Sequence, residues 1–370
     1  MFFKILFLLK ILKFINWINV SGKKKKYPKV IQLPLTNKCN SKCVMCNVWK
    51  MSNSNEMTID EFAKYMKDPL FKKVNSVGIN GGEPSLIPNL EKYAEKILAL
   101  PSIRSLNIIS NGFNKNILKQ IRSIYVLSKE KGVHFHVSIS LDGYEDVHNK
   151  IRRIPNAFKK VTYVIDELHT NKEKYCDSLE VACTVMQQNV DYLIELDTYA
   201  KQKNYNMTYR LAVSNKRIGS EKIFSKYSVL AEEKCIQTAK EFFYTKYKQS
   251  QRVREKYKYF LIFHYLGFRI PKRLFACPWQ DSGVTINARG ELFYCAVESK
   301  MIGSLRHSIG KNIFFKDENI KYRQELIKNY CDHCIHYVFR PNRKSLLIIL
   351  NNIFHEKYYP VWYKLKAKFL

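Results

Sequence analysis

A chain of 370 residues exceeds a typical single domain, and a hydrophobic fraction of 46% supplies a core, so one large domain followed by a smaller one is expected. The ten cysteines lack the density of a small secreted scaffold, which argues against a disulfide framework and for a reducing, cytoplasmic compartment. The net charge of +31 fits anionic lipid, nucleic acid or an acidic substrate as partner, or a compositional habit of the source genome.

The first segment, residues 1–27, is apolar and basic. Residues 1–20 are mostly Phe, Leu and Ile, and four lysines follow at residues 23–26. This pattern predicts an amphipathic helix in the membrane interface, drawn to the anionic cytoplasmic leaflet. A spanning helix is the alternative, although its lysines would be costly at mid-depth. A cleaved signal peptide is disfavoured because no small-residue cleavage site follows. We therefore expect a cytoplasmic protein that contacts the inner face of the membrane peripherally.

Strand-like runs recur between longer, polar-faced stretches in the next part of the chain. They cover residues 30–36, 74–80, 105–110, 133–141, 179–186 and 207–213. One intervening stretch opens with Thr58 and Glu61 at the spacing of a capping box, which marks a helix start. Strands that alternate with helices predict parallel βα units. In barrels built from such units, active-site groups gather at the carboxyl ends of the strands.

Three cysteines follow the first of these strands. Cys39, Cys43 and Cys46 have C-x3-C-x2-C spacing, and thiolates are the ligands that a [4Fe–4S] cluster requires. Three ligands leave one iron open, which marks a metal centre that carries out chemistry. Structural zinc is the alternative. It would need a fourth Cys or His, and the nearest in sequence are His134 and His136, so zinc is the weaker interpretation.

The run Gly81-Gly82-Glu83-Pro84 follows the second predicted strand. By itself it would be an ordinary strand-to-helix turn, but together with the three cysteines it resembles the motifs of the radical S-adenosylmethionine (SAM) superfamily. The resemblance implies an α/β fold, a partial (β/α)6 TIM-like barrel over residues 28–213. It also implies that the glycine turn binds the amino group of SAM, whose amino and carboxylate groups chelate the open iron. An electron from the cluster would then cleave SAM to methionine and a 5′-deoxyadenosyl radical, which abstracts hydrogen from the substrate.

Two further segments match this family at the same rim of the barrel. Asn111 begins an Asn-Gly pair after the third strand, and Ser140 ends the fourth strand, with Arg152 further on. In relatives, polar groups here approach the ribose or carboxylate of SAM, and the Arg152 guanidinium offers a bidentate fork for that carboxylate. An Asn-Gly pair alone is usually only a turn. Asp142 and His148 are otherwise expected to cap the turn and the following helix.

Beyond the barrel, residues 214–272 are charged and predict a helical linker without assignable chemistry. Residues 273–340 contain a predicted hairpin at 284–294 and the remaining spaced cysteines, namely Cys277, Cys295, Cys331 and Cys334. Four cysteines complete a metal site, and a zinc ribbon is one interpretation. The layout resembles the shortened SPASM, or twitch, domain of radical SAM enzymes, which implies one auxiliary [4Fe–4S] cluster. The tail, residues 341–370, is basic and amphipathic and predicts either a docked helix or a membrane contact.

A fully ligated second cluster would accept or relay an electron, which favours net oxidation of the substrate. Relatives implied by the resemblance oxidise a hydroxyl of a cyclitol or sugar, or modify ribosomal peptides. The membrane-facing ends favour a cell-envelope saccharide or related small molecule, with a peptide maturase as the alternative. An RNA-modifying enzyme would suit the charge, but no RNA-binding module is recognisable, so nucleic acid is not an expected partner. A non-catalytic metal-binding scaffold is the remaining class. An enzyme of this family would need a reductant such as flavodoxin or ferredoxin.

Overall fold

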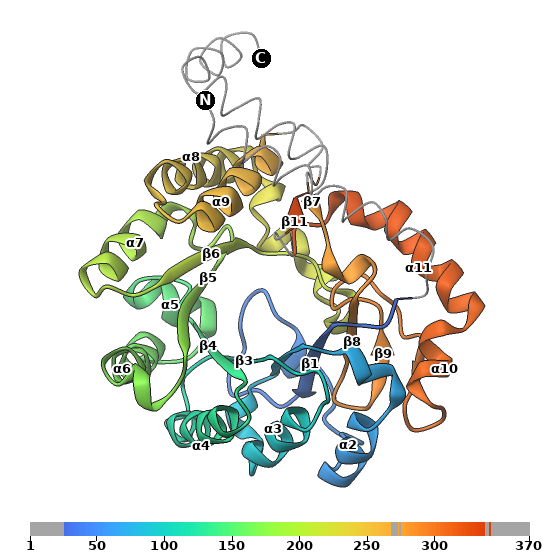
Figure 1. Ribbon diagram of the computed structural model, residues 1–370. Helices are drawn as coiled ribbons and strands as arrows, with labels where there is room; N and C mark the ends of the chain where they lie inside the picture. The colour runs from blue at the N-terminus through green and yellow to red at the C-terminus, as the bar shows by residue number, and fades with distance from the viewer. Residues whose placement is uncertain (1–25, 268–272, 274, 337–339, 342–370) are drawn as a thin grey trace, which may run out of the picture.

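The computed structural model describes residues 26–267, 273, 275–336 and 340–341, and its centre is a curved sheet (Figure 1). Six parallel strands form most of that sheet, in chain order from β1 to β6. They are β1 (Val30–Thr36), β2 (Ser76–Gly81), β3 (Ser105–Ser110), β4 (His134–Ser140), β5 (Ser178–Val185) and β6 (Met207–Leu211). The prediction of a partial (β/α)6 barrel is confirmed.

Helices cover the outer face of these strands (Figure 1). They are α2 (Ile59–Met66), α3 (Leu90–Leu98), α4 (Asn116–Glu130), α5 (Glu145–Arg152), α6 (Ala157–Thr170) and α7 (Leu193–Gln202). The strands alternate in burial, so that residues such as Ile31 and Leu33 are fully buried under the apolar faces of the helices. The capping box at Thr58 and Glu61 is present, with both reciprocal hydrogen bonds.

Strand boundaries differ slightly from the sequence prediction. The second strand begins at Ser76 rather than at residue 74, because Val74 closes the short 3-10 helix Pro69–Lys73. The sixth ends at Leu211, two residues earlier than predicted. Apolar residues at a strand edge extend the sequence pattern beyond the residues that pair.

After β6 the chain forms two packed helices, α8 (Glu233–Gln249) and α9 (Val253–Leu266), in the region expected to be a helical linker. Both lie beyond the β6 edge of the barrel (Figure 1). Phe243 of α8 packs against Tyr259 of α9, with ring centroids 5.9 Å apart. Apolar rings therefore hold the pair together.

The C-terminal strands join the same sheet at its other edge. β8 (Gly283–Ile286) pairs parallel with β1, and β9 (Glu291–Phe293) and β10 (Gly303–Ser304) follow antiparallel. The helices α10 (Gly310–Phe315) and α11 (Asp317–Tyr330) flank them, and β7 (Phe275–Ala276) pairs with β11 (Arg340–Pro341). The predicted hairpin is therefore present and extends the barrel sheet. The domain boundary at residue 273 remains a prediction.

The two predicted membrane-facing segments, residues 1–20 and the tail from residue 342, lie outside the described residues. Within the part of the chain that the structure describes, no helix is long and apolar enough to cross a membrane.

Candidate active site and auxiliary cysteine site

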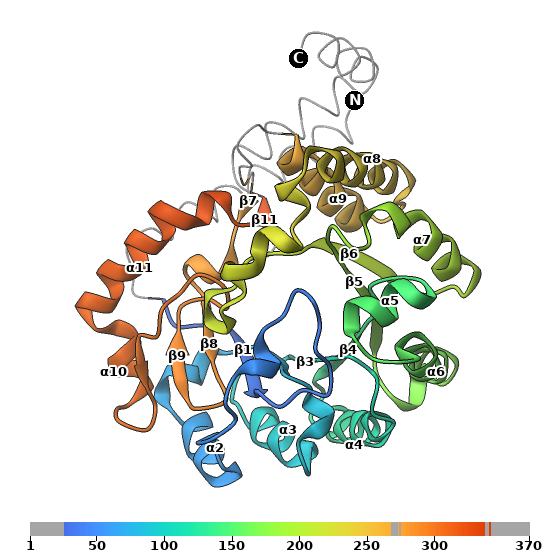
Figure 2. The ribbon, with the colours of Figure 1, turned by 180° about the vertical axis from the view of Figure 1, so that it is seen from behind.

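The loop that carries Cys39, Cys43 and Cys46 leaves the carboxyl end of β1 and lies in the middle of the ring of strands (Figure 2). Burial raises the pKa of Cys39 to about 12 and that of Cys46 to about 11, and the neighbouring thiols raise both further. Three thiols whose charges disfavour one another lie close together. A cation that compensates three thiolates would therefore be favoured here.

The glycine turn after β2 packs directly on this cysteine loop. The Gly82 N–H donates to the Thr36 carbonyl at 2.6 Å, and the Glu83 N–H donates to the Lys38 carbonyl at 2.8 Å. A Cβ on Gly82 would lie 1.9 Å from the Lys38 oxygen, and Gly81 has a φ of +133°. Only glycine permits this approach and this backbone conformation. The turn was predicted to bind SAM; the structure shows that it also fixes the cysteine loop.

Glu83 braces the carboxyl ends of two strands from within. Its buried carboxylate accepts hydrogen bonds from Ser110 Oγ at 2.6 Å and from the Asn111 N–H at 2.8 Å. Burial raises the pKa of Glu83, and these hydrogen bonds oppose that rise. The Asn111 side chain in turn donates to Asn40 Oδ1 at 2.7 Å, next to Cys39. The predicted residues Glu83 and Asn111 therefore meet at the cysteine loop.

Arg152 reaches the same loop from α5. Its guanidinium pairs with the buried carboxylate of Asp142 and donates to Cys43 Sγ at 3.6 Å. Burial lowers the pKa of Arg152, but Asp142 and Cys43 outweigh that effect and raise it overall. The predicted contact with the carboxylate of SAM remains a prediction, because the fork faces Asp142 and a thiol. Ser140 ends β4, half-buried, at the same rim.

Asp142 and His148 have the turn-stabilising role expected for them. The Asp142 N–H donates to His148 Nδ1 at 3.0 Å, and Asp142 Oδ1 accepts from the Thr184 N–H at 2.8 Å. Ser41 was missed by the sequence reasoning. Its hydroxyl lies 2.9 Å from Cys43 Sγ and donates to the Arg152 carbonyl. A polar residue between two cysteines of the motif was the available signal.

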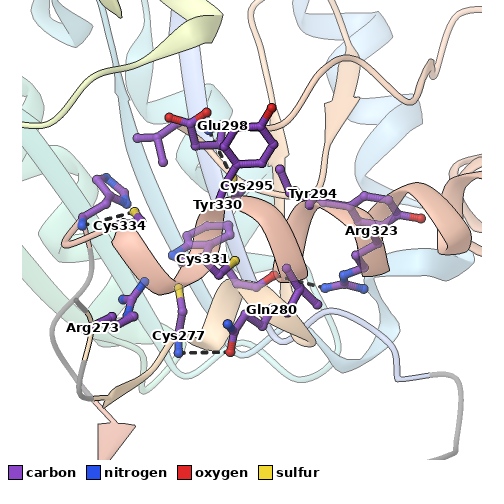
Figure 3. A pocket seen from close by; sticks show the side chains of 15 residues that line it. Arg273, Cys277, Gln280, Tyr294, Cys295, Glu298, Arg323, Tyr330, Cys331 and Cys334 are labelled. Carbon is purple, nitrogen blue, oxygen red and sulfur yellow. Dashed lines mark hydrogen bonds between the residues drawn. The ribbon is translucent and has the colours of Figure 1, made fainter. Parts of the chain in front are cut away.

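The other spaced cysteines, Cys277, Cys295, Cys331 and Cys334, line one cavity. They come from the segment after β7, the end of β9 and the end of α11. Figure 3 shows them around a common space, with Arg273 on one side and Arg323 on the other. The structure thus brings together the four residues that the sequence grouped as one site.

Hydrogen bonds and charges act directly on these thiols. Backbone N–H groups of Glu298 and His336 donate to Cys295 Sγ and Cys334 Sγ, each at 3.4 Å. Burial raises the pKa of Cys331 and of Cys334 to about 11, and Arg273 opposes both shifts. Positive charge and N–H donors beside buried sulfur are suited to thiolate ligands.

The arrangement of side chains bears on the kind of metal. Within the described ranges, no three His, Cys, Asp or Glu side chains are placed to hold a single metal ion. Four ligands of one zinc would converge at Zn–S distances of about 2.3 Å. Each cysteine of a [4Fe–4S] cluster binds a different iron, so its sulfurs stand further apart. The donor set is all thiol, and its spacing fits a cluster better than one ion.

A further cavity, of about 550 Å³, connects the two cysteine regions, and the sequence gave no sign of it. It begins at Asn37, two residues before Cys39, and at Arg217. It ends at Glu298 and Tyr330, which also line the auxiliary cysteine cavity. We call it the connecting cavity; its remaining lining residues are Met51, Lys216, Asn287, Arg289, Glu291, Phe293, Ser299, Lys300 and Tyr322.

Comparison with known proteins gives matches over the barrel. The family model described as the radical SAM superfamily matches residues 33–185. A probable GTP 3′,8-cyclase from Methanocella arvoryzae is 28% identical over 165 residues, which cover 44% of this chain and 47% of that protein. The sporulation killing factor maturation protein SkfB of Bacillus subtilis is 26% identical over 176 residues, covering 47% and 40%. The matches therefore span about half or less of these curated relatives.

Solved structures match over more of the chain. The anSMEcpe structure with bound AdoMet has a TM-score of 0.59 at 18% identity and covers 90% of this chain and 97% of its own. Streptococcus suis SuiB bound to its precursor peptide SuiA has a TM-score of 0.55 at 13% identity, covering 80% and 66%. At these identities the likeness shows the fold, a partial barrel with additional C-terminal strands.

Proposed function

We propose that this chain, which belongs to the radical SAM superfamily, modifies a polar small molecule, a cell-envelope saccharide or related compound, in the connecting cavity. The chain is a radical SAM enzyme, and the family implies a [4Fe–4S] cluster with bound SAM. When bound, these cofactors supply the one-electron cleavage of SAM that produces a hydrogen-abstracting 5′-deoxyadenosyl radical.

The residues around the first cysteine site suit that chemistry. Cys39, Cys43 and Cys46 would hold the cluster, because they supply three thiols on one loop and leave one iron for SAM. Arg152 places a positive charge and an N–H donor on the Cys43 thiol. Glu83 fixes the glycine turn and the end of β3 around the loop. These contacts would keep the SAM site in place without moving when the cofactors bind.

The observation that carries the proposal is the position of the connecting cavity. Its walls include residues beside the first cysteine site and two residues shared with the auxiliary cavity. A volume of about 550 Å³ is typical of small-molecule sites. Asn, Arg, Lys, Glu and Tyr side chains line it, which supports a substrate rich in hydroxyl or charged groups.

We propose that Cys277, Cys295, Cys331 and Cys334 hold one auxiliary [4Fe–4S] cluster. The common cavity, the all-thiol donor set and the spacing too wide for one ion support this assignment over zinc. A cluster at this position would accept an electron from the substrate radical. Net oxidation of the substrate is therefore the proposed outcome.

A peptide substrate is the second candidate. A neighbouring cavity of about 320 Å³, lined mostly by apolar residues, shares Glu298 and Tyr330 with the connecting cavity. An extended peptide would pass through both, whereas a saccharide needs only one. The names of SkfB and SuiB bound to its precursor peptide describe peptide chemistry in similar proteins.

Anaerobic reconstitution tests the proposal. We expect about eight irons per chain, two [4Fe–4S] clusters, and formation of 5′-deoxyadenosine from SAM with flavodoxin or ferredoxin as reductant. A fully reconstituted sample that does not cleave SAM would favour the metal-binding scaffold. Isotope transfer from deuterated sugar phosphates into 5′-deoxyadenosine, and not from peptides, would separate the two substrate classes. Transfer from RNA alone would favour the RNA-modifying alternative.

Peripheral membrane contact through residues 1–26 is also proposed, from the sequence pattern alone. The full chain should bind anionic vesicles at low salt more strongly than neutral ones, because each lysine at the surface contributes about 1 kcal/mol that salt screens. A chain lacking residues 1–26 should lose this binding and keep SAM cleavage. Full-length protein that does not sediment with anionic vesicles would remove the argument for an envelope substrate.

A further inference from the structure

The connecting cavity carries an uneven set of charges. Four basic side chains line it, those of Lys216, Arg217, Arg289 and Lys300, against two carboxylates, Glu291 and Glu298. Two more cations than carboxylates in a partly enclosed space produce a positive potential. The question is which of these charges are already compensated.

Both carboxylates have partners within the protein. Glu298 pairs with Lys216 Nζ at 3.0 Å and accepts a hydrogen bond from Ser214 Oγ at 3.2 Å. Glu291 accepts from Asn287 Nδ2 at 2.6 Å. Lys216 also lies over the Tyr330 ring, 4.2 Å from its centroid. These contacts leave Arg217, Arg289 and Lys300 without a carboxylate partner among the described residues.

Arg217 is the least satisfied of the three. It sits in the short 3-10 helix Lys216–Ile218 that follows β6. Its Nε and Nη1 atoms are buried and have no hydrogen-bond partner in the described part of the chain. Burial lowers the pKa of Arg217 to about 10, so the group stays protonated at neutral pH, and its charge reaches the Cys46 thiol. A buried, charged donor without an acceptor is costly, which indicates that a ligand supplies one.

Arg289 and Lys300 complete the basic wall. Arg289 lies in the turn between β8 and β9, where Nη2 donates to the Ser52 carbonyl at 3.2 Å while the buried Nε has no partner among the described residues. The Lys300 ammonium lies 4.5 Å from the centroid of the Tyr322 ring. The ring orients the lysine and leaves its N–H groups available to a ligand.

We propose that the connecting cavity binds an anionic group of the substrate, a phosphate or a carboxylate, with Arg217 as its main ligand and Arg289 and Lys300 as additional donors. The proposal rests on the proposed function for the identity of the cavity as the substrate site. A guanidinium is suited to this role because its planar N–H fork matches the oxygen pairs of both anions. The substrate class narrows accordingly to phosphorylated or carboxylated small molecules.

Equilibrium dialysis of the reconstituted full chain tests this inference without turnover. Inorganic phosphate is the probe in one arm and acetate in the other, both at physiological ionic strength to suppress general attraction to the basic surface. We expect saturable binding of one anion per chain, and the tighter-binding probe identifies phosphate or carboxylate. Arg217→Gln should weaken binding about tenfold, because a hydrogen bond to a charged group is lost. Arg217→Lys should fall between, since it keeps the charge and loses the fork.

Two further variants keep the result interpretable. Arg289→Gln should weaken binding less than Arg217→Gln, because one Arg289 nitrogen is already engaged by Ser52; it also serves if Arg217→Gln fails to fold. Lys119→Gln removes an exposed charge outside the cavity and should leave binding unchanged. Absence of saturable binding, or equal weakening by Lys119→Gln, would overturn the inference. Cleavage of SAM by the wild-type sample is assayed separately, so a chain that binds phosphate but does not cleave SAM contradicts only the proposed function.

Discussion

The two cysteine sites of this protein are built in opposite ways. Cys39, Cys43 and Cys46 lie within one loop after β1, whereas Cys277, Cys295, Cys331 and Cys334 come from distant segments that meet only when β8, β9 and α11 are in place. A local loop needs bracing from its surroundings, which the turn after β2, the end of β3 and α5 supply. A site assembled from several elements is instead held by the fold itself.

Positive charge accompanies sulfur at both sites, but its origin differs. Arg152 is buried, faces Cys43 and is paired with Asp142. Arg323, near the auxiliary cysteines, donates to the Trp279 carbonyl at 3.2 Å and stacks on Tyr294, 4.6 Å from the ring centroid. The first arginine is tied to a carboxylate and the second to a carbonyl and a ring. We therefore expect the first site to depend on a buried ion pair and the second to depend on packing.

Removal of the triad should have the largest effect on SAM cleavage. A variant with Cys39, Cys43 and Cys46 all changed to Ala should lose cleavage entirely and retain about half of the iron, the share of the auxiliary site. Iron analysis and chromatography of 5′-deoxyadenosine measure both. Cys176→Ala, which changes a buried cysteine outside both sites, is the matched control and should retain all the iron. Cleavage that survives in the triple variant would end the catalytic assignment.

The bracing of the loop is tested by two glycines of β2 and its turn. Gly82→Ala places a methyl group 1.9 Å from the Lys38 oxygen, so the cysteine loop must move. We expect at least a tenfold loss of SAM cleavage and a loss of stability of about 1–3 kcal/mol. Gly78→Ala, in the same strand, meets no atom within 4 Å and should leave both unchanged. Equal behaviour of the two variants in urea unfolding and in cleavage would show that the turn does not support the loop.

The sequence predicted the local features of these sites well. The strand periodicity placed six strands within a few residues, and the triad was visible because its three ligands lie within one short stretch. The capping box at Thr58 was readable for the same reason. Features that depend on fewer than ten consecutive residues leave a direct pattern in the sequence.

Long-range features could not be read in the same way. Arg152 was assigned to SAM because a guanidinium suits a carboxylate, but the carboxylate that it meets is Asp142, ten residues away on another turn. Pairing of β8 with β1 joins residues about 250 positions apart, and no periodicity encodes such a contact. The connecting cavity escaped for the same reason, since its walls come from four separate segments.

Arg152 should have an intermediate effect on SAM cleavage. Arg152→Met leaves the buried Asp142 carboxylate unpaired, which costs about 3–5 kcal/mol, and removes an N–H donor from Cys43. The reduction potential of the cluster should become more negative, because a positive charge beside a thiolate ligand is lost. Urea unfolding and a redox titration followed by electron paramagnetic resonance measure these effects. Adding Asp142→Asn to Arg152→Met should restore part of the stability but not the potential, and an unchanged potential in both variants would contradict the role of Arg152 at Cys43.

The auxiliary cysteines should affect SAM cleavage least and product formation most, which is the sharpest difference between the two sites. Cys331→Ala combined with Cys334→Ala removes two ligands that come from the end of α11 and leaves the loop after β1 and its braces untouched. Reductive cleavage of SAM should therefore persist while the oxidised product disappears, because the substrate radical loses its electron acceptor. Mass spectrometry of the reaction mixture and iron analysis of the variant measure both outcomes. Stoichiometric zinc in the wild-type site, with product formation intact, would show that these four thiols hold the fold and carry no electron.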